Sequence, residues 1–187
     1  MSNPWDLPPI PIEGDHVDGP IYEGVGRALS NWEKLELQLA RLYSWFETKN
    51  RFDQEAIGRY GKPPNFRARL SALERSGEGH SRLYPDQNIE AEFFKLRCCV
   101  EKFAARRNDI AHGIVLALPW MGVNFSLPLT FALFPPDFKH TKYAPGKLPT
   151  YALVSADLLR FSAAFHDLGA RSARLLHQLE RTRGAWR

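Results

Sequence analysis

The sequence predicts a mainly α-helical protein, an antiparallel helical bundle with a small β-hairpin inserted after the helix expected at 88–111. Several long stretches carry apolar side chains at steps of three and four residues, which is the spacing of a helix that buries one face in a bundle. Residues 113–136 contain no charged residue, and their second half alternates as a strand does. The 187 residues fit one domain with a short appendage.

The appendage is a proline-rich arm over residues 1–20, because proline cannot donate the hydrogen bonds of helices and sheets. Its prolines are Pro4, Pro8, Pro9, Pro11 and Pro20. The apolar side chains of the arm either dock on the body or on a second subunit, or the arm is a loosely held tail. A single helical domain is expected over 21–183, with residues 114–154 as its hairpin and loop insertion.

The first predicted helix spans 21–48 and a short helix follows at 53–60. The stripe that predicts the first helix consists of Leu29, Trp32, Leu35, Leu39, Leu42 and Phe46. These positions fall on one helix face, so this face is expected in the core.

Two further helices are predicted in the middle of the chain. Asn65 can cap a helix over 66–76, and Gly77 and Gly79 are expected to end it, because glycine is the usual residue at helix ends. The next helix is expected over 88–111, immediately before another glycine.

The uncharged stretch predicts a hairpin over 114–134 rather than a membrane span. Prolines and polar residues interrupt it, and the period-two positions indicate a strand with one buried face. These positions are Phe125, Leu127, Leu129, Phe131 and Leu133. A short strand at 151–154 and a long helix at 156–182, capped by Ser155, complete the prediction.

The composition indicates a cytoplasmic protein with a mild basic bias. The net charge of +4 and the pI of about 9.2 are compatible with an anionic partner. Cys98 and Cys99 are adjacent, so no disulfide framework is expected, and the N-terminus lacks a signal-peptide pattern. The histidines show no metal-ligand spacing, so neither a metal nor another cofactor is expected.

Arg107 interrupts the apolar face of the helix predicted at 88–111. The apolar positions on this face are Phe93, Leu96, Val100, Phe103 and Ile110. Burying a guanidinium without a partner is costly, so Arg107 needs an anionic side chain, a wet crevice or a bound anion. Glu36 likewise stands on an apolar stripe and is the expected partner. Departures of this kind are typical of functional sites.

His112 and Asn108 extend the candidate site around Arg107. His112 lies about 140° around the helix from Arg107, so their side chains do not stack, whereas Asn108 lies four residues before His112 on the same face. Two copies of the helix meeting at a symmetry axis would bring two Arg–His pairs into one composite site. Histidine can act as acid or base, and a guanidinium stabilises a phosphate in its transition state.

Structural roles remain open for the same residues. His112 can serve as a cation at a helix C-terminus, and Asp109 is expected to face solvent or to cap the helix. The arginines of the last helix can track a nucleic-acid backbone, but a solvated helix face is favoured.

The segment Arg107-Asn108-Asp109-Ile110-Ala111-His112 resembles the R-x4-6-H motif of the HEPN-domain family, which also places a polar residue after the arginine. The resemblance covers residues 88–113 well and the rest of 21–182 only as a loose topology. It implies a helical bundle that dimerises through the motif helices and cleaves RNA without a metal. Family roles include toxins of toxin–antitoxin systems and phage-defence effectors, so RNA, a homodimer and an antitoxin protein are the implied partners. Arg107, Asn108 and His112 would be catalytic, with Glu36 and Asp109 supporting.

Two further functions stay open beside the endoribonuclease. The first is a non-catalytic HEPN-like dimer that acts as an interaction or nucleic-acid-binding module. The second is a bundle that binds a small molecule or nucleotide at a pocket beside Arg107.

Overall fold

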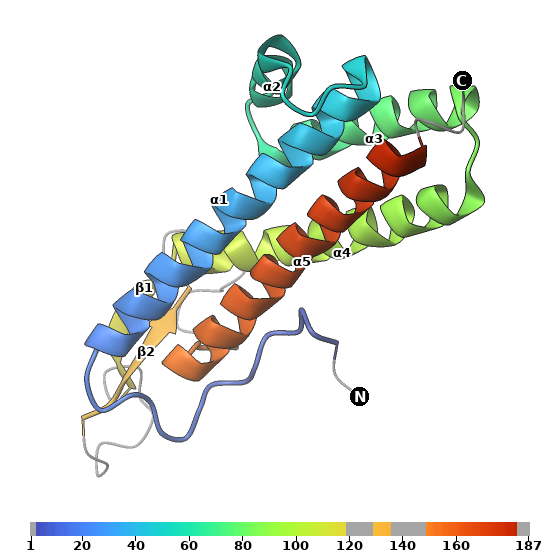
Figure 1. The fold of residues 1–187 in the computed structure, drawn as a ribbon. Helices are drawn as coiled ribbons and strands as arrows, with labels where there is room; N and C mark the ends of the chain where they lie inside the picture. The colour runs from blue at the N-terminus through green and yellow to red at the C-terminus, as the bar shows by residue number, and fades with distance from the viewer. Residues whose placement is uncertain (1–2, 119–128, 136–148, 183–187) are drawn as a thin grey trace. The chain divides into compact units, whose positions relative to one another are not determined.

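The computed structural model describes residues 3–118, 129–135 and 149–182, and over these residues the protein is mainly α-helical. The described part contains five helices and a two-stranded antiparallel hairpin that follows the fourth helix (Figure 1), as the sequence predicts. In chain order they are α1 (Gly19–Thr48), α2 (Gln54–Gly61), α3 (Phe66–Leu83), α4 (Gln87–Ala111), β1 (Ile114–Ala117), β2 (Phe131–Phe134) and α5 (Ser155–Thr182). Among the described helices, none is long and apolar enough to cross a membrane.

The chain forms two compact units, each built from two segments. Unit 1 comprises residues 1–31 and 105–164, and unit 2 comprises residues 32–104 and 165–187. The divisions between the units fall inside α1, α4 and α5. The single domain predicted over 21–183 therefore contains parts of both units.

The hairpin of unit 1 is extended along the edge of β2 that does not pair with β1. Its register pairs Ile114 with Phe134 and Ala117 with Phe131. Asp15 forms an isolated bridge with Phe131, and Leu153 forms another with Leu133. The N-terminal arm therefore docks on the edge of the hairpin, and the strand predicted at 151–154 is reduced to one bridge before α5 begins.

Strand β2 is covered on both faces, so the predicted single buried face is wrong for this strand. Ala132, Leu133 and Phe134 are all buried. Ala132 and Phe134 belong to an apolar cluster against which Ile10 of the arm packs, whereas Leu133 faces Gly113. Ile10 of the arm thus packs on one face of β2, and Gly113, in the turn after α4, lies against the other. The predicted alternating positions at 125 and 127 lie outside the described residues.

Asp15 also joins the arm to the first turn of α5. Its carboxylate accepts hydrogen bonds from the backbone N–H of Ser155 at 2.8 Å and from the Ser155 hydroxyl at 2.6 Å. The helix begins at Ser155 itself, one residue earlier than predicted. A carboxylate from the arm therefore occupies the position where the helix dipole favours negative charge.

The core of unit 2 is a cluster of aromatic side chains from its helices. Trp32 of α1 makes edge-on contacts with Phe66 of α3 and Phe165 of α5. Phe165 also makes an edge-on contact with Phe103 of α4. Edge-on aromatic pairs of this kind stabilise the fold beyond the contribution of the apolar surface that they bury. Of the stripe that predicts α1, all positions from Trp32 onward are buried.

Helix α3 continues seven residues beyond its predicted end, because Gly77 is a packing position rather than a stop. A Cβ atom at Gly77 would lie 2.5 Å from the Phe93 ring of α4. The missing side chain makes room for this ring, and the helix runs on to Leu83.

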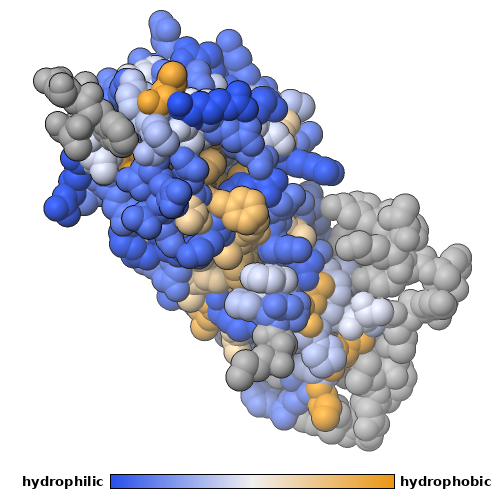
Figure 2. All heavy atoms as spheres, turned by 90° about the vertical axis from the view of Figure 1, so that its right-hand side faces the viewer, coloured by the Kyte–Doolittle hydropathy of each residue, from blue (hydrophilic) through white to orange (hydrophobic). Residues whose placement is uncertain are grey.

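Hydrophilic side chains cover most of the face shown in Figure 2, with apolar ones between them.

Candidate functional site at the end of helix α4

The apolar face of α4 forms as predicted, and Arg107 stands within it. Leu96, Val100, Phe103 and Ile110 are buried, whereas Arg107 is half-buried. Its Nη1 donates a hydrogen bond to Oδ1 of Asn108, at 3.3 Å. Arg107 is therefore a cation at the border between the apolar face and solvent.

Asn108 and His112 follow Arg107 on the exposed side of the helix end. Both residues are exposed. The His112 backbone N–H donates to the Asn108 carbonyl at 3.2 Å, which continues the helical hydrogen bonding by one residue beyond Ala111. The structure thus places the imidazole at the C-terminal end of α4, where the helix dipole favours a cation.

Gly113 fixes the direction in which the chain leaves this helix. A Cβ atom at Gly113 would lie 2.6 Å from the Leu133 side chain. Only a residue without a side chain permits this close approach, so the turn after His112 leads directly into β1. His112 therefore lies on the short connection between α4 and β1, directly after the helix end that carries Arg107 and Asn108.

Asp109 is part of a mostly buried polar network, so the prediction that it faces solvent or caps the helix is wrong. Its Oδ2 forms an ion pair with Nη2 of Arg106 at 3.0 Å, and its Oδ1 accepts a hydrogen bond from the Tyr151 hydroxyl at 3.1 Å. The Arg106 and Asp109 side chains are only 16% and 14% exposed. Arg106 also donates to the Trp5 carbonyl of the arm, at 3.3 Å. The network ties α4 to the arm and to the segment before α5, all within unit 1.

Glu36 has partners in unit 2 that differ from the predicted one. Its carboxylate forms an ion pair with Nη2 of Arg69 at 3.0 Å and accepts a hydrogen bond from Nε1 of Trp32 at 2.9 Å. The prediction paired Glu36 with Arg107. The structure gives Arg69 of α3 instead, because Arg69 brings a guanidinium to the carboxylate while Trp32 donates from the preceding turn of α1. Glu36 is therefore a structural residue of the unit 2 core.

Four of the five predicted site residues thus lie at one end of α4, where Asn108 and His112 are exposed, Arg107 is half-buried and Asp109 belongs to the mostly buried network. The sequence reasoning missed Arg106 and Tyr151, which hold Asp109. The i, i+3 spacing of Arg106 and Asp109 was a usable signal for the ion pair. Nothing in the sequence pointed to Tyr151, which is distant in the chain.

The exposed part of this group offers chemistry suited to a phosphodiester. A guanidinium presents several donors to phosphate oxygens, an imidazole exchanges protons near neutral pH, and an amide can orient a substrate.

No protein-family model, curated protein or solved structure matches the chain.

Proposed function

We propose that the protein is a metal-independent endoribonuclease of the HEPN type, whose composite site forms where the α4 ends of two copies meet at a two-fold axis. The observation that carries the proposal is the placement of Arg107, Asn108 and His112 on one solvent-reaching helix end. The proposed biological role is that of a toxin or phage-defence effector restrained by an antitoxin protein.

The proposed reaction uses the 2′-hydroxyl of the RNA as the nucleophile. Its oxygen attacks the adjacent phosphorus, the bond from phosphorus to the 5′-oxygen breaks, and the products are a 2′,3′-cyclic phosphate and a 5′-hydroxyl. One imidazole accepts the proton of the 2′-hydroxyl while another donates a proton to the leaving oxygen. Two copies of His112 at a two-fold site would supply both roles.

Arg107 would stabilise the extra negative charge that develops on the phosphate oxygens. A preformed cation at a developing charge is a strong electrostatic contribution to catalysis, and loss of one such donor lowers rates by about 100-fold or more. Asn108 accepts a hydrogen bond from Nη1 of the Arg107 guanidinium, which carries five N–H donors in all. Asn108 is accordingly assigned a positioning role.

The test is incubation of purified protein with single-stranded RNA in the presence of a chelator. Arg107→Ala and His112→Ala should each lower the rate of cleavage by about 100-fold or more, and the products should carry cyclic phosphate ends. Lys102→Ala and His166→Ala are matched controls, because each removes an exposed basic or imidazole side chain elsewhere on α4 and α5. Both controls should cleave at the wild-type rate.

Cleavage that is unchanged in Arg107→Ala and His112→Ala would refute the assignment of the site. A wild-type protein that binds RNA as a dimer without cleaving it would instead support the non-catalytic module.

A further inference from the structure

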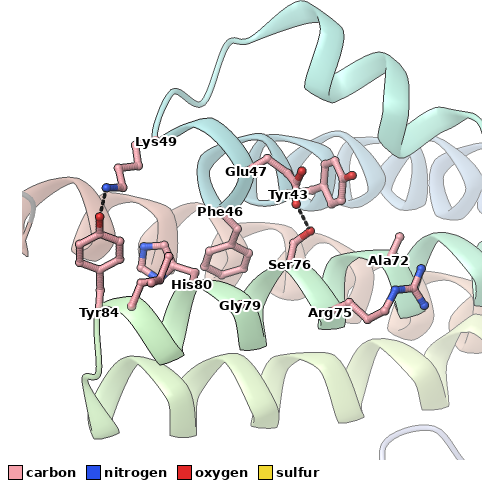
Figure 3. Close-up of a pocket in the computed structure, with 11 residues that line it drawn as sticks. Tyr43, Phe46, Glu47, Lys49, Ala72, Arg75, Ser76, Gly79, His80 and Tyr84 are labelled. Atoms are coloured by element: carbon pink, nitrogen blue, oxygen red, sulfur yellow. Dashed lines mark hydrogen bonds between the residues drawn. The ribbon is translucent and has the colours of Figure 1, made fainter.

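A cavity of about 480 Å³ lies in unit 2, between the C-terminal part of α1 and the second half of α3 (Figure 3). The volume falls within the range of about 300–1,000 Å³ that is usual for small-molecule sites. None of the residues that line this cavity belongs to the site proposed at the end of α4, so the cavity is a separate candidate binding site.

A row of rings forms one wall of the cavity. The ring centroids of Phe46 and His80 are 5.2 Å apart, and those of His80 and Tyr84 are 5.1 Å apart. Figure 3 shows these three side chains in succession along the cavity. A wall of this kind suits a flat apolar or aromatic group.

Cationic groups stand at both ends of this row. Lys49 lies at one end, with its ammonium against the Tyr84 hydroxyl and 4.0 Å from the centre of the Tyr84 ring. Arg75 is exposed at the other end. Among the described side chains that line the cavity, Glu47 is the one carboxylate, and it accepts a hydrogen bond from the Ser76 hydroxyl. The lining therefore favours an anion.

Hydrogen-bond donors gather at the Lys49 end. The ammonium has three N–H donors and the contact with Tyr84 uses one of them. Burial, and to a smaller extent Lys49, lowers the pKa of His80, so its imidazole is neutral at neutral pH and presents one N–H donor. Several donors around one point match the several acceptor oxygens of a phosphate.

The backbone of Lys49 gives an independent reason to single it out. Lys49 directly follows the last residue of α1 and has a φ of 56°, a left-handed conformation that glycine or asparagine adopts more easily. A lysine here is unfavourable for the helix end. Its side chain, however, reaches the mouth of the cavity from this position (Figure 3).

We propose that this cavity binds an aromatic phosphate monoester, with the phosphate against Lys49, His80 and Tyr84 and the ring along Phe46 toward Arg75. A nucleotide has this chemistry, and it can be a free nucleoside monophosphate or the phosphorylated end of a single-stranded RNA. The guanidinium of Arg75 would stack on the face of the base.

Calorimetry with the full chain tests the ligand class. Adenosine monophosphate should bind at least about tenfold more tightly than adenosine or inorganic phosphate, because the cavity holds both ring and phosphate. A short RNA with a 5′-phosphate, measured on His112→Ala protein to prevent cleavage, distinguishes the two sources. Tighter binding of the RNA assigns the site to a strand end, and equal or weaker binding assigns it to the free nucleotide. Adenosine monophosphate that binds no better than its parts would overturn the proposal.

Two variants with matched controls test the location. Lys49→Asn removes the ammonium with a residue that tolerates the left-handed backbone, and should weaken binding about tenfold or more. Arg82→Gln removes an exposed charge from the same stretch of α3, outside the cavity, and should have no effect.

Gly79 lines the cavity, and a Cβ atom there meets no other atom within 4 Å. Gly79→Leu therefore has room for a side chain that would occupy the cavity, and it should abolish binding. Gly79→Ala, which adds only a methyl group, should bind as the wild type does. Wild-type affinity in both Lys49→Asn and Gly79→Leu would place the ligand elsewhere and refute the site.

Discussion

Arg106 and Arg107 are consecutive residues with different surroundings. Arg106 is largely buried in the network with Asp109 and Tyr151, while Arg107 is half-buried beside the exposed Asn108. Consecutive residues on a helix point about 100° apart. The Arg106 side chain therefore packs inside unit 1, whereas the Arg107 side chain is partly exposed to solvent. Arg106, which joins the buried network, is thus a structural residue, and its neighbour is the candidate for chemistry.

Loss of the Asp109 carboxylate should destabilise the protein. Asp109→Ala leaves the Arg106 guanidinium largely buried without its anion, so the free energy of unfolding should fall by about 2–4 kcal/mol. Tyr151→Phe removes one hydrogen bond and should cost about 0.5–1.5 kcal/mol. Urea denaturation measures both effects. Asp167→Ala, at an exposed carboxylate on α5, is the control and should change stability by less than about 0.5 kcal/mol. Equal stability of Asp109→Ala and Asp167→Ala would contradict a structural role for Asp109.

Helix α3 shows how one element depends on its neighbour. Gly77 and Gly79 both lie inside the helix, although glycine weakens helix interiors. Gly77 is buried against the Phe93 ring, whereas open space surrounds Gly79. Contact with α4 therefore explains the first glycine, and the second faces the cavity between α1 and α3.

Substitution of the two glycines by alanine should have opposite effects. Gly77→Ala forces the Phe93 ring away from its edge-on contact with Phe46, so stability should fall by about 1–3 kcal/mol. Gly79→Ala should raise stability by about 0.5–1 kcal/mol, because alanine loses less conformational freedom on folding. Thermal unfolding of the two variants side by side measures the difference. A stabilised Gly77→Ala protein would show that the ring moves aside freely.

The proposed endoribonuclease depends on a second copy of the whole chain. Within the described residues, one copy supplies one Arg107 and one His112 at the end of α4. The proposed reaction needs both a proton acceptor and a proton donor, which two copies of His112 provide. The dimer and the activity are therefore linked parts of one proposal.

Mixing the wild type with His112→Ala protein tests this link. A mixed dimer holds only one His112, which cannot be proton acceptor and proton donor in the same step, so an excess of His112→Ala protein should inhibit the wild type after subunit exchange. Dilution of the wild type with the same excess of an unrelated inert protein is the control and should leave the rate unchanged. A wild type that keeps its full rate in excess His112→Ala protein, despite demonstrated subunit exchange, would indicate that each copy cleaves RNA by itself.

Local patterns in the sequence are enough to predict the five helices, the place of the hairpin and the position of Arg107 at the edge of an apolar face. These features follow from the periodicity of apolar residues within short segments, which does not depend on residues distant in the chain. The same local spacing placed Arg107, Asn108 and His112 on one helix end, and α4 carries them there.

The partners of the charged residues and of the helix glycines depend on the tertiary fold. Glu36 pairs with Arg69, Asp109 pairs with Arg106 and Tyr151, and Gly77 receives the Phe93 ring. Each of these outcomes depends on which distant segments the packing brings together, and a sequence pattern carries no such information. The spacing of apolar residues shows that Glu36 and Arg107 are charged residues at apolar positions. Which residue of opposite charge pairs with each of them depends on which side chains are close in the folded protein.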